Sequence, residues 1–158
     1  GVDRVPFFYY RAKLETERAI EESGLPWTIL RTTQFHDLIA AMWSAQKRLP
    51  VMFVPGGVRF QPIDVREVAG RLGELAVADA RGRVPDLGGP ETREARDLAR
   101  IYLRAVGRRR RLLPVRLPGE AGRAYRAGGN LALEGSVGRI TFAEFLRGAE
   151  PGGQGHQL

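Results

Sequence analysis

The chain has 158 residues, a net charge of +7 and a pI of about 10.7, and 43% of its residues are hydrophobic. This length fits one domain or a large part of one, and the hydrophobic share is enough for a packed core. The absence of cysteine excludes disulfides, thiolate catalysis and cysteine-ligated zinc, and with only His36 and His156 a histidine-rich metal site is excluded too.

Hydrophobic periodicity and turn residues predict alternating helices and strands, which indicates an α/β domain. Gly24 and Pro26 end the first amphipathic helix. Asp64 is predicted to cap a later helix, with Glu67 completing a capping box. The predicted helices cover about 8–23, 35–47, 65–78, 92–106, 119–127 and 141–147. The predicted strands cover about 27–32, 51–54, 58–61, 84–87 and 112–117.

Targeting signals are not evident in the sequence. No apolar run approaches the roughly 20 residues that a membrane helix needs, and the first ten residues do not resemble a signal peptide. We therefore expect a cytoplasmic protein with no membrane partner. The chain starts at Gly1 without an initiator methionine, so we expect either a processed protein or a fragment.

A tyrosine and a lysine four residues apart, Tyr9 and Lys13, lie on the first predicted helix. Residues i and i+4 share one helix face, so this spacing places a phenol beside an ammonium. A nearby cation stabilises a phenolate, so such a tyrosine can exchange a proton with a carbonyl or alcohol oxygen near neutral pH. The same spacing also occurs on solvated helix faces. Tyr10 is a competing phenol, but its i+4 neighbour is Leu14, which favours Tyr9.

Four segments in a fixed order give this pair a context. They are 6–15 (PFFYYRAKLE), 23–37 (SGLPWTILRTTQFHD), 60–69 (FQPIDVREVA) and 87–90 (LGGP). Together they resemble the NmrA-like branch of the atypical short-chain dehydrogenase/reductases, and the resemblance covers roughly 1–146. It is specific for the family and says little about the substrate.

The resemblance implies a Rossmann-like doubly wound parallel sheet, of which this chain would be the C-terminal portion. The glycine pairs at 56–57, 88–89 and 128–129 lack the Gly-x-Gly-x-x-Gly spacing of the N-terminal βαβ half, so we expect that half to be missing. The domain is expected to span 1–147, followed by a disordered tail over 148–158. An incomplete sheet leaves an open edge, so we expect the chain alone to be marginally stable, aggregation-prone or homo-oligomeric.

The resemblance also implies residue roles. Tyr9 would be the acid/base at a small-molecule substrate, and Lys13 would bind the nicotinamide ribose of NADP or NAD. The residues implied to lie against the nicotinamide are Thr32, Thr33, Gln34 and Phe35. The Ser/Thr that completes the acid/base set in the family, and the residue that selects NAD or NADP, would lie upstream of Gly1.

Other polar residues near the predicted strand ends have two interpretations each. His36 either orients a substrate or bonds to a backbone carbonyl, and Asp37 follows it. Asp64 is more typical of an N-cap than of a catalytic carboxylate. Arg31 and Arg59 are candidates for contact with a phosphate or carboxylate, and Arg59 is also a candidate for contact with the substrate. The aromatic residues predicted to pack in or near the core are Trp27, Trp43, Phe53 and Phe60.

The leading functional hypothesis is an NAD(P)-binding oxidoreductase or epimerase-like protein, present as a partial chain that is inactive alone. An alternative is a non-catalytic regulator that senses NAD(P)H. A distant alternative is a basic nucleic-acid-binding module, based on the net charge and on the run Arg108–Arg111, for which solvation of a helix end is the favoured interpretation.

Overall fold

The helices agree closely with the periodicity of the sequence. The computed structural model describes residues 3–6, 8–132 and 134–148, so the predicted tail lies almost entirely outside the described residues. Within them the helices are α1 (Phe8–Glu21), α2 (His36–Ser44), α3 (Val65–Ala76), α4 (Ala95–Ala105), α5 (Gly119–Arg126) and α6 (Phe142–Gly148). Each follows a predicted helix with its ends shifted by a few residues. Gly24, with a φ of 71°, lies just beyond α1, as expected for a helix stop.

Strands occur at four predicted positions, 27–32, 51–54, 58–61 and 112–117, and the others differ from the prediction. The parallel pairs are β1 (Thr28–Ile29) with β4 (Gly82–Arg83), β2 (Val51–Pro55) with β7 (Arg111–Val115), and β5 (Leu87–Gly88) with β8 (Ser136–Val137). The antiparallel pair is β3 (Arg59–Phe60) with β6 (Arg93–Glu94). The predicted continuous strand over 84–87 is wrong, because β4 ends at Arg83 and β5 begins only at Leu87. β6 occupies the predicted start of α4, and β8 was not predicted.

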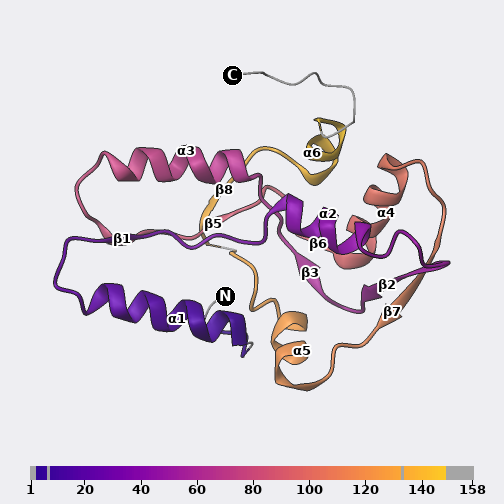
Figure 1. Cartoon of the computed structure of the whole chain (residues 1–158), viewed down its shortest axis with the longest axis horizontal. Coiled ribbons are helices and arrows are strands. Elements are labelled where there is room, and N and C mark those ends of the chain that lie inside the picture. Colours follow the sequence, from indigo (N-terminus) through magenta and orange to yellow (C-terminus); the bar gives the residue numbers. More distant parts are fainter. Residues whose placement is uncertain (1–2, 7, 133, 149–158) are drawn as a thin grey trace.

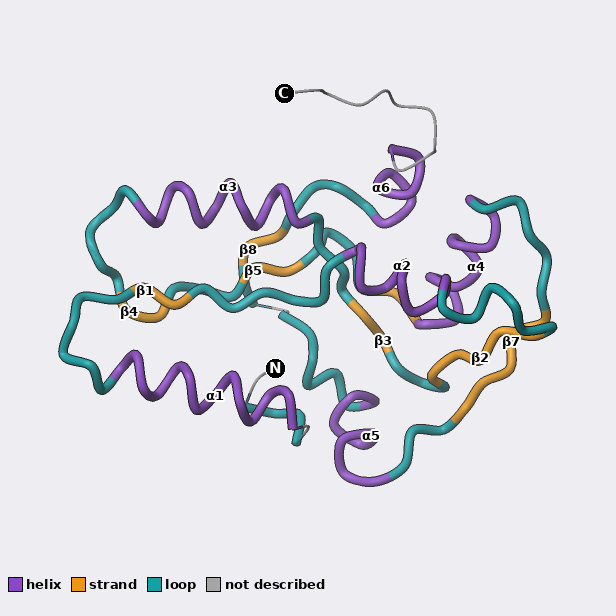
Figure 2. The backbone as a smooth tube through the Cα atoms, in the orientation of Figure 1, coloured by secondary structure: helices purple, strands orange, loops and turns teal. Residues whose placement is uncertain are grey.

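An extended segment carries the chain from β1 to α2 between α1 and α3 (Figure 1, Figure 2). Isolated parallel bridges join Thr32 to Leu87 and Phe35 to Ile63. The Leu87 N–H donates to the Arg31 carbonyl at 2.8 Å, and the Thr33 N–H donates to the Leu87 carbonyl at 3.1 Å. These bonds fix the backbone of 31–36 against its neighbours and so determine where its side chains lie.

The main core lies at the end of the molecule that holds α2, α4 and β2 (Figure 1). Trp43 is 1% exposed and Phe60 7%, which confirms their predicted packing, and Trp27 is half-buried. Phe53 was also predicted to pack, but it is 44% exposed. The reason is strand alternation, which turns Met52 and Val54 inward and the residue between them outward.

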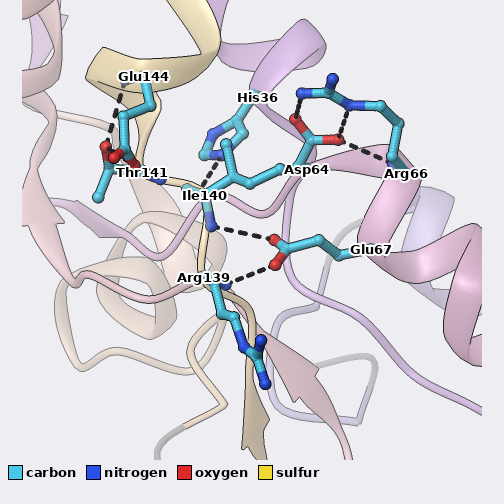
Figure 3. Close-up of polar contacts among 8 residues, drawn as sticks. All are labelled: His36, Asp64, Arg66, Glu67, Arg139, Ile140, Thr141 and Glu144. Atoms are coloured by element: carbon cyan, nitrogen blue, oxygen red, sulfur yellow. Dashed lines mark hydrogen bonds and ion pairs between the residues drawn. The ribbon is translucent and has the colours of Figure 1, made fainter.

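The start of α3 confirms one prediction and corrects another. Asp64 is the N-cap, and its carboxylate accepts a hydrogen bond from the Arg66 N–H at 2.8 Å. The predicted capping box is wrong, because the Glu67 carboxylate instead accepts from the Arg139 N–H at 2.6 Å and the Ile140 N–H at 3.4 Å (Figure 3). Glu67 thus anchors the segment that leads into α6. None of the described helices has the length and apolarity that a membrane crossing needs.

Candidate functional site

A pocket of about 320 Å³ lies between α1 and the extended segment that follows β1. Its lining residues are Tyr9, Tyr10, Lys13, Glu17, Leu30, Arg31, Thr32, Thr33, Gln34, Phe35 and Leu38. Every residue assigned by resemblance to proton transfer or to the nicotinamide is therefore in one pocket. Two elements produce this: α1 contributes the Tyr-x-x-x-Lys face, and the backbone bonds of 31–36 hold the other wall opposite it.

The Tyr9–Lys13 pair lines this pocket from α1. The Lys13 Nζ lies 5.6 Å from the centroid of the Tyr9 ring, a distance typical of a cation–π contact. Tyr9 is 52% exposed, and the ring of Tyr10 packs edge-on against it with centroids 5.7 Å apart. The helix spacing thus brings the ammonium over the ring of the tyrosine, and both residues line the pocket.

A network of charges joins the two walls. Arg31 is 8% exposed, and its guanidinium donates to both carboxylate oxygens of Glu17, with distances of 2.9 Å from Nε to Oε1 and 2.5 Å from Nη2 to Oε2. Its Nη1 donates to Asp3 at 3.1 Å. The hydrogen bond to Glu17 raises the pKa of Arg31. Arg31 was a candidate for an external phosphate or carboxylate, but its partners are carboxylates of its own chain.

The hydroxyl of Thr33 is hydrogen-bonded to the protein backbone. Its Oγ1 donates to the Gln61 carbonyl at 2.5 Å and accepts from the Gly89 N–H at 3.3 Å. The amide of Gln61 in turn donates to the Gly89 carbonyl at 2.9 Å. Thr33 therefore has only its backbone to offer a ligand, whereas Thr32, Gln34 and Phe35 are half-buried.

His36 and Arg59 lie outside this pocket, and the structure gives no support to their role as substrate contacts. His36 is fully buried, with its Nε2 2.9 Å from the Ile140 carbonyl oxygen (Figure 3) and its ring packed near Phe142 and Phe145. The backbone-bonded interpretation of His36 is thus the one that the structure shows. Burial lowers the pKa of His36. Arg59 is exposed on β3, and Asp37 is exposed on α2.

The arginine run after α4 contributes to a separate surface. A groove of about 690 Å³ between α4 and β7 is lined by several arginines, three of them from this run. Two arginines of the run donate to backbone carbonyls just beyond α2. Arg108 donates to the Lys47 carbonyl at 3.2 Å, and Arg110 donates to the Gln46 carbonyl at 2.6 Å. The run follows α4 as predicted, but these two guanidinium groups bond to carbonyls beyond the end of α2 and not to the end of α4. The groove lacks aromatic side chains that could stack on bases.

A smaller cavity of about 30 Å³ adjoins the pocket and shares several of its wall residues. Its lining residues are Tyr10, Arg31, Thr32, Thr33, Gln34, Asp86, Asn130, Leu131 and Ala132. Asn130 is 3% exposed and was missed by sequence reasoning. It lies in the turn after α5, where an asparagine next to glycines is typical of an ordinary loop, so no local signal marks it.

Solved structures show where this fold occurs. An NADPH-dependent quinone oxidoreductase from Escherichia coli has 17% identity and a TM-score of 0.73, with 93% of this chain and 63% of that chain covered. A nucleoside-diphosphate-sugar epimerase from Staphylococcus aureus has 17% identity and a TM-score of 0.67, with 90% of this chain and 59% of that chain covered. A UDP-glucose 4-epimerase from Thermus thermophilus, in complex with NAD, has 18% identity and a TM-score of 0.53, with 88% of this chain and 49% of that chain covered.

These similarities establish the fold. The α/β architecture is part of a Rossmann-like fold, as the sequence predicted, and the chain spans about 60% of the length of the first two structures. No family model matches the sequence, and no curated protein sequence matches it. Among the residues that the structure describes, no group of three His, Asp or Glu side chains is placed to hold a metal ion.

Proposed function

We propose that the pocket between α1 and residues 32–35 binds the nicotinamide end of NADP or NAD, in a protein of the oxidoreductase or epimerase-like class. The observation that carries the proposal is the convergence of Tyr9, Lys13 and the strand-end segment on one pocket. Two structures of similar fold add support, since one is an NADPH-dependent oxidoreductase and another is an epimerase in complex with NAD.

The residues present fit part of a dinucleotide. About 320 Å³ is at the lower end of the range for ligand pockets, which suits a nicotinamide with its ribose better than a whole dinucleotide. The exposed ammonium of Lys13 offers three hydrogen-bond donors to ribose hydroxyls. Phe35 and Leu38 provide apolar surface for a flat ring. The Gly-rich phosphate turn is not among the described residues, so nothing is assigned to the phosphates.

The chemistry follows from which groups can move a proton. When bound, the nicotinamide supplies or accepts a hydride. Tyr9 carries the phenol of the Tyr-x-x-x-Lys pair and lines the pocket, so it would give a proton to a carbonyl oxygen or take one from an alcohol. Lys13 would hold the hydroxyls of the ribose.

A titration with the chain's two lysines as a matched pair tests this proposal. NADPH and NADH are added to the purified chain, and binding is followed by nicotinamide fluorescence and thermal shift. We expect Lys13→Met to weaken binding at least tenfold and Lys47→Met, on an exposed turn after α2, to leave it unchanged. Equal effects of the two substitutions, or no binding up to millimolar cofactor, would contradict the proposal.

The alternative to an enzyme is a non-catalytic NAD(P)H sensor, which would use the same pocket without proton transfer by Tyr9. The two candidates differ in turnover. A sensor binds NADPH but does not oxidise it with any ketone, aldehyde or quinone, whereas an enzyme loses turnover in Tyr9→Phe and keeps its cofactor affinity.

A further inference from the structure

The groove between α4 and β7 carries positive charge that the described part of the chain does not neutralise. Six arginines line it, and none of its lining residues is acidic. Only Arg100 among the six has an ion pair with a described residue, to Asp97 at 2.9 Å, and both side chains are about half exposed. The six are Arg96, Arg100 and Arg104 from α4 and Arg109, Arg110 and Arg111 from the segment that enters β7.

This lack of carboxylates is a property of the groove and not of every arginine in the chain. Elsewhere an arginine often has an acidic residue two or three positions away, as in the pairs Arg66 with Asp64 at 2.8 Å, Arg71 with Glu74 at 2.7 Å and Arg93 with Glu91 at 2.7 Å. The arginines of α4 instead follow one another at i and i+4, where like charges repel and destabilise a helix. A bound anion would relieve that repulsion.

The guanidinium groups of the groove have donors to spare for a ligand. The side chains of Arg96, Arg109 and Arg111 are exposed and make no hydrogen bond within the described ranges. Arg104 has one long bond, from its Nε to the Arg100 carbonyl at 3.4 Å. A guanidinium binds a carboxylate through two parallel N–H···O bonds, so each of these side chains can hold one acidic group.

The spacing of the arginines on α4 fits an extended peptide. Arg96, Arg100 and Arg104 are four residues apart, which at 1.5 Å per residue separates neighbours by about 6 Å along the helix axis. Alternate side chains of an extended segment lie on one face about 6.7 Å apart. Acidic residues at every second position of such a segment therefore match the row of arginines, and the residues between them face away from α4.

We propose that this groove binds an extended acidic segment of a partner protein, in which acidic and apolar residues alternate. The site is separate from the nicotinamide pocket and does not depend on it. The opposite wall favours a peptide over a nucleic-acid strand, because Leu112, Leu113 and Pro114 offer aliphatic surface to the apolar residues and no lining side chain is aromatic. The volume of about 690 Å³ lies within the range of ligand sites.

Four probes with the same fluorescent label test the groove on the unaltered full chain, with dissociation constants measured by fluorescence anisotropy. The first is the peptide Asp-Val-Asp-Val-Asp-Val, and the second has Asn for every Asp and so keeps the shape without the charge. The third has Ser for every Val, and the fourth is a tetrathymidylate, which also carries three negative charges. We expect the first to bind at least about tenfold more tightly than the second, since bonds between two charged groups are stronger than those to a neutral amide. It should also bind at least about threefold more tightly than the third and the fourth.

Two double variants of equal net charge locate the binding. Arg96→Gln/Arg104→Gln removes two charges from the groove, and we expect it to weaken binding of the first peptide at least about tenfold. Arg11→Gln/Arg18→Gln removes two exposed charges from α1, away from α4 (Figure 1), and should change the constant less than about twofold. All four side chains are exposed, so thermal unfolding should show both variants folded.

Each of four outcomes would overturn the proposal. One is equal binding of the Asp and Asn peptides, or no measurable binding of the Asp peptide. Equal losses in the two double variants would show attraction to net charge without a site. Tighter binding of the tetrathymidylate would assign the groove to nucleic acid, and equal binding of the Ser peptide would remove the role of the aliphatic wall. The comparisons among probes use the unaltered chain, so they decide the matter even if a variant fails to fold.

Discussion

The ion pair between Arg31 and Glu17 is predicted to be the most important polar contact of the candidate site. The side chains are 7% and 14% exposed, and they join the wall that carries residues 32–35 to the helix that carries Tyr9 and Lys13. Replacing Arg31 by Met leaves the Glu17 carboxylate with little access to water and without its cation. Removal of one partner from a buried ion pair costs about 3–5 kcal/mol, and the residual exposure of Glu17 places our expectation near the lower end, at about 3 kcal/mol.

The assay is urea-induced unfolding of a double-mutant cycle. Arg31→Met/Glu17→Gln removes both charges and should recover at least about 1 kcal/mol relative to Arg31→Met alone. The control is Arg71→Met, because Arg71 pairs with Glu74 at 2.7 Å on the surface, where the side chains are 36% and 68% exposed. Exposed pairs contribute about 0–1 kcal/mol. If Arg31→Met costs no more than Arg71→Met, the reasoning from burial is refuted.

Two further predictions concern the surroundings of the site. Burial lowers the pKa of His36, so the imidazole takes up a proton more readily in the unfolded chain than in the folded one. The stability that neutral His36 contributes is therefore complete above its ordinary pKa near 6.5 and is lost as the pH falls below that value. Unfolding free energies between pH 5 and 8 should show this loss, and His36→Gln should flatten the profile. Gly89→Ala would place a Cβ in direct overlap with the Pro62 carbonyl oxygen and should destabilise by more than about 2 kcal/mol in thermal unfolding, whereas Gly73→Ala, in α3 with no atom within 4 Å, should stabilise by about 0.5–1 kcal/mol.

Helices were predictable from the sequence because their determinants are local. The apolar period of 3.6 residues, the cap at Asp64 and the stop at Gly24 are each readable within one turn. Among the strands, β1, β2, β3 and β7 fall on predicted ones, but β4, β6 and β8 do not, because a strand of two residues is defined by its partner and not by its own sequence. Arg93–Glu94, for example, has helical propensity and yet pairs with Arg59–Phe60. Glu67 failed as a capping-box residue for the same reason, since its partners lie more than 70 residues further along the chain.

The residues of the candidate site differ in the same way: some are placed by local sequence and others by distant contacts. Tyr9 and Lys13 are neighbours on a helix, and 32–35 follow directly from a strand, so a motif of local spacing suffices to find the pocket. Asn130 reaches the adjoining cavity only because its amide bonds to the Arg59 carbonyl and the turn after α5 packs beside β3, contacts across about 70 residues of sequence. Tyr9 and Lys13 thus belong to a motif that the sequence displays, whereas Asn130 belongs to a loop that it does not mark. The pocket also depends on a distant helix, because the hydroxyl of Tyr125 in α5 donates to the hydroxyl of Tyr10 on the pocket wall at 3.4 Å.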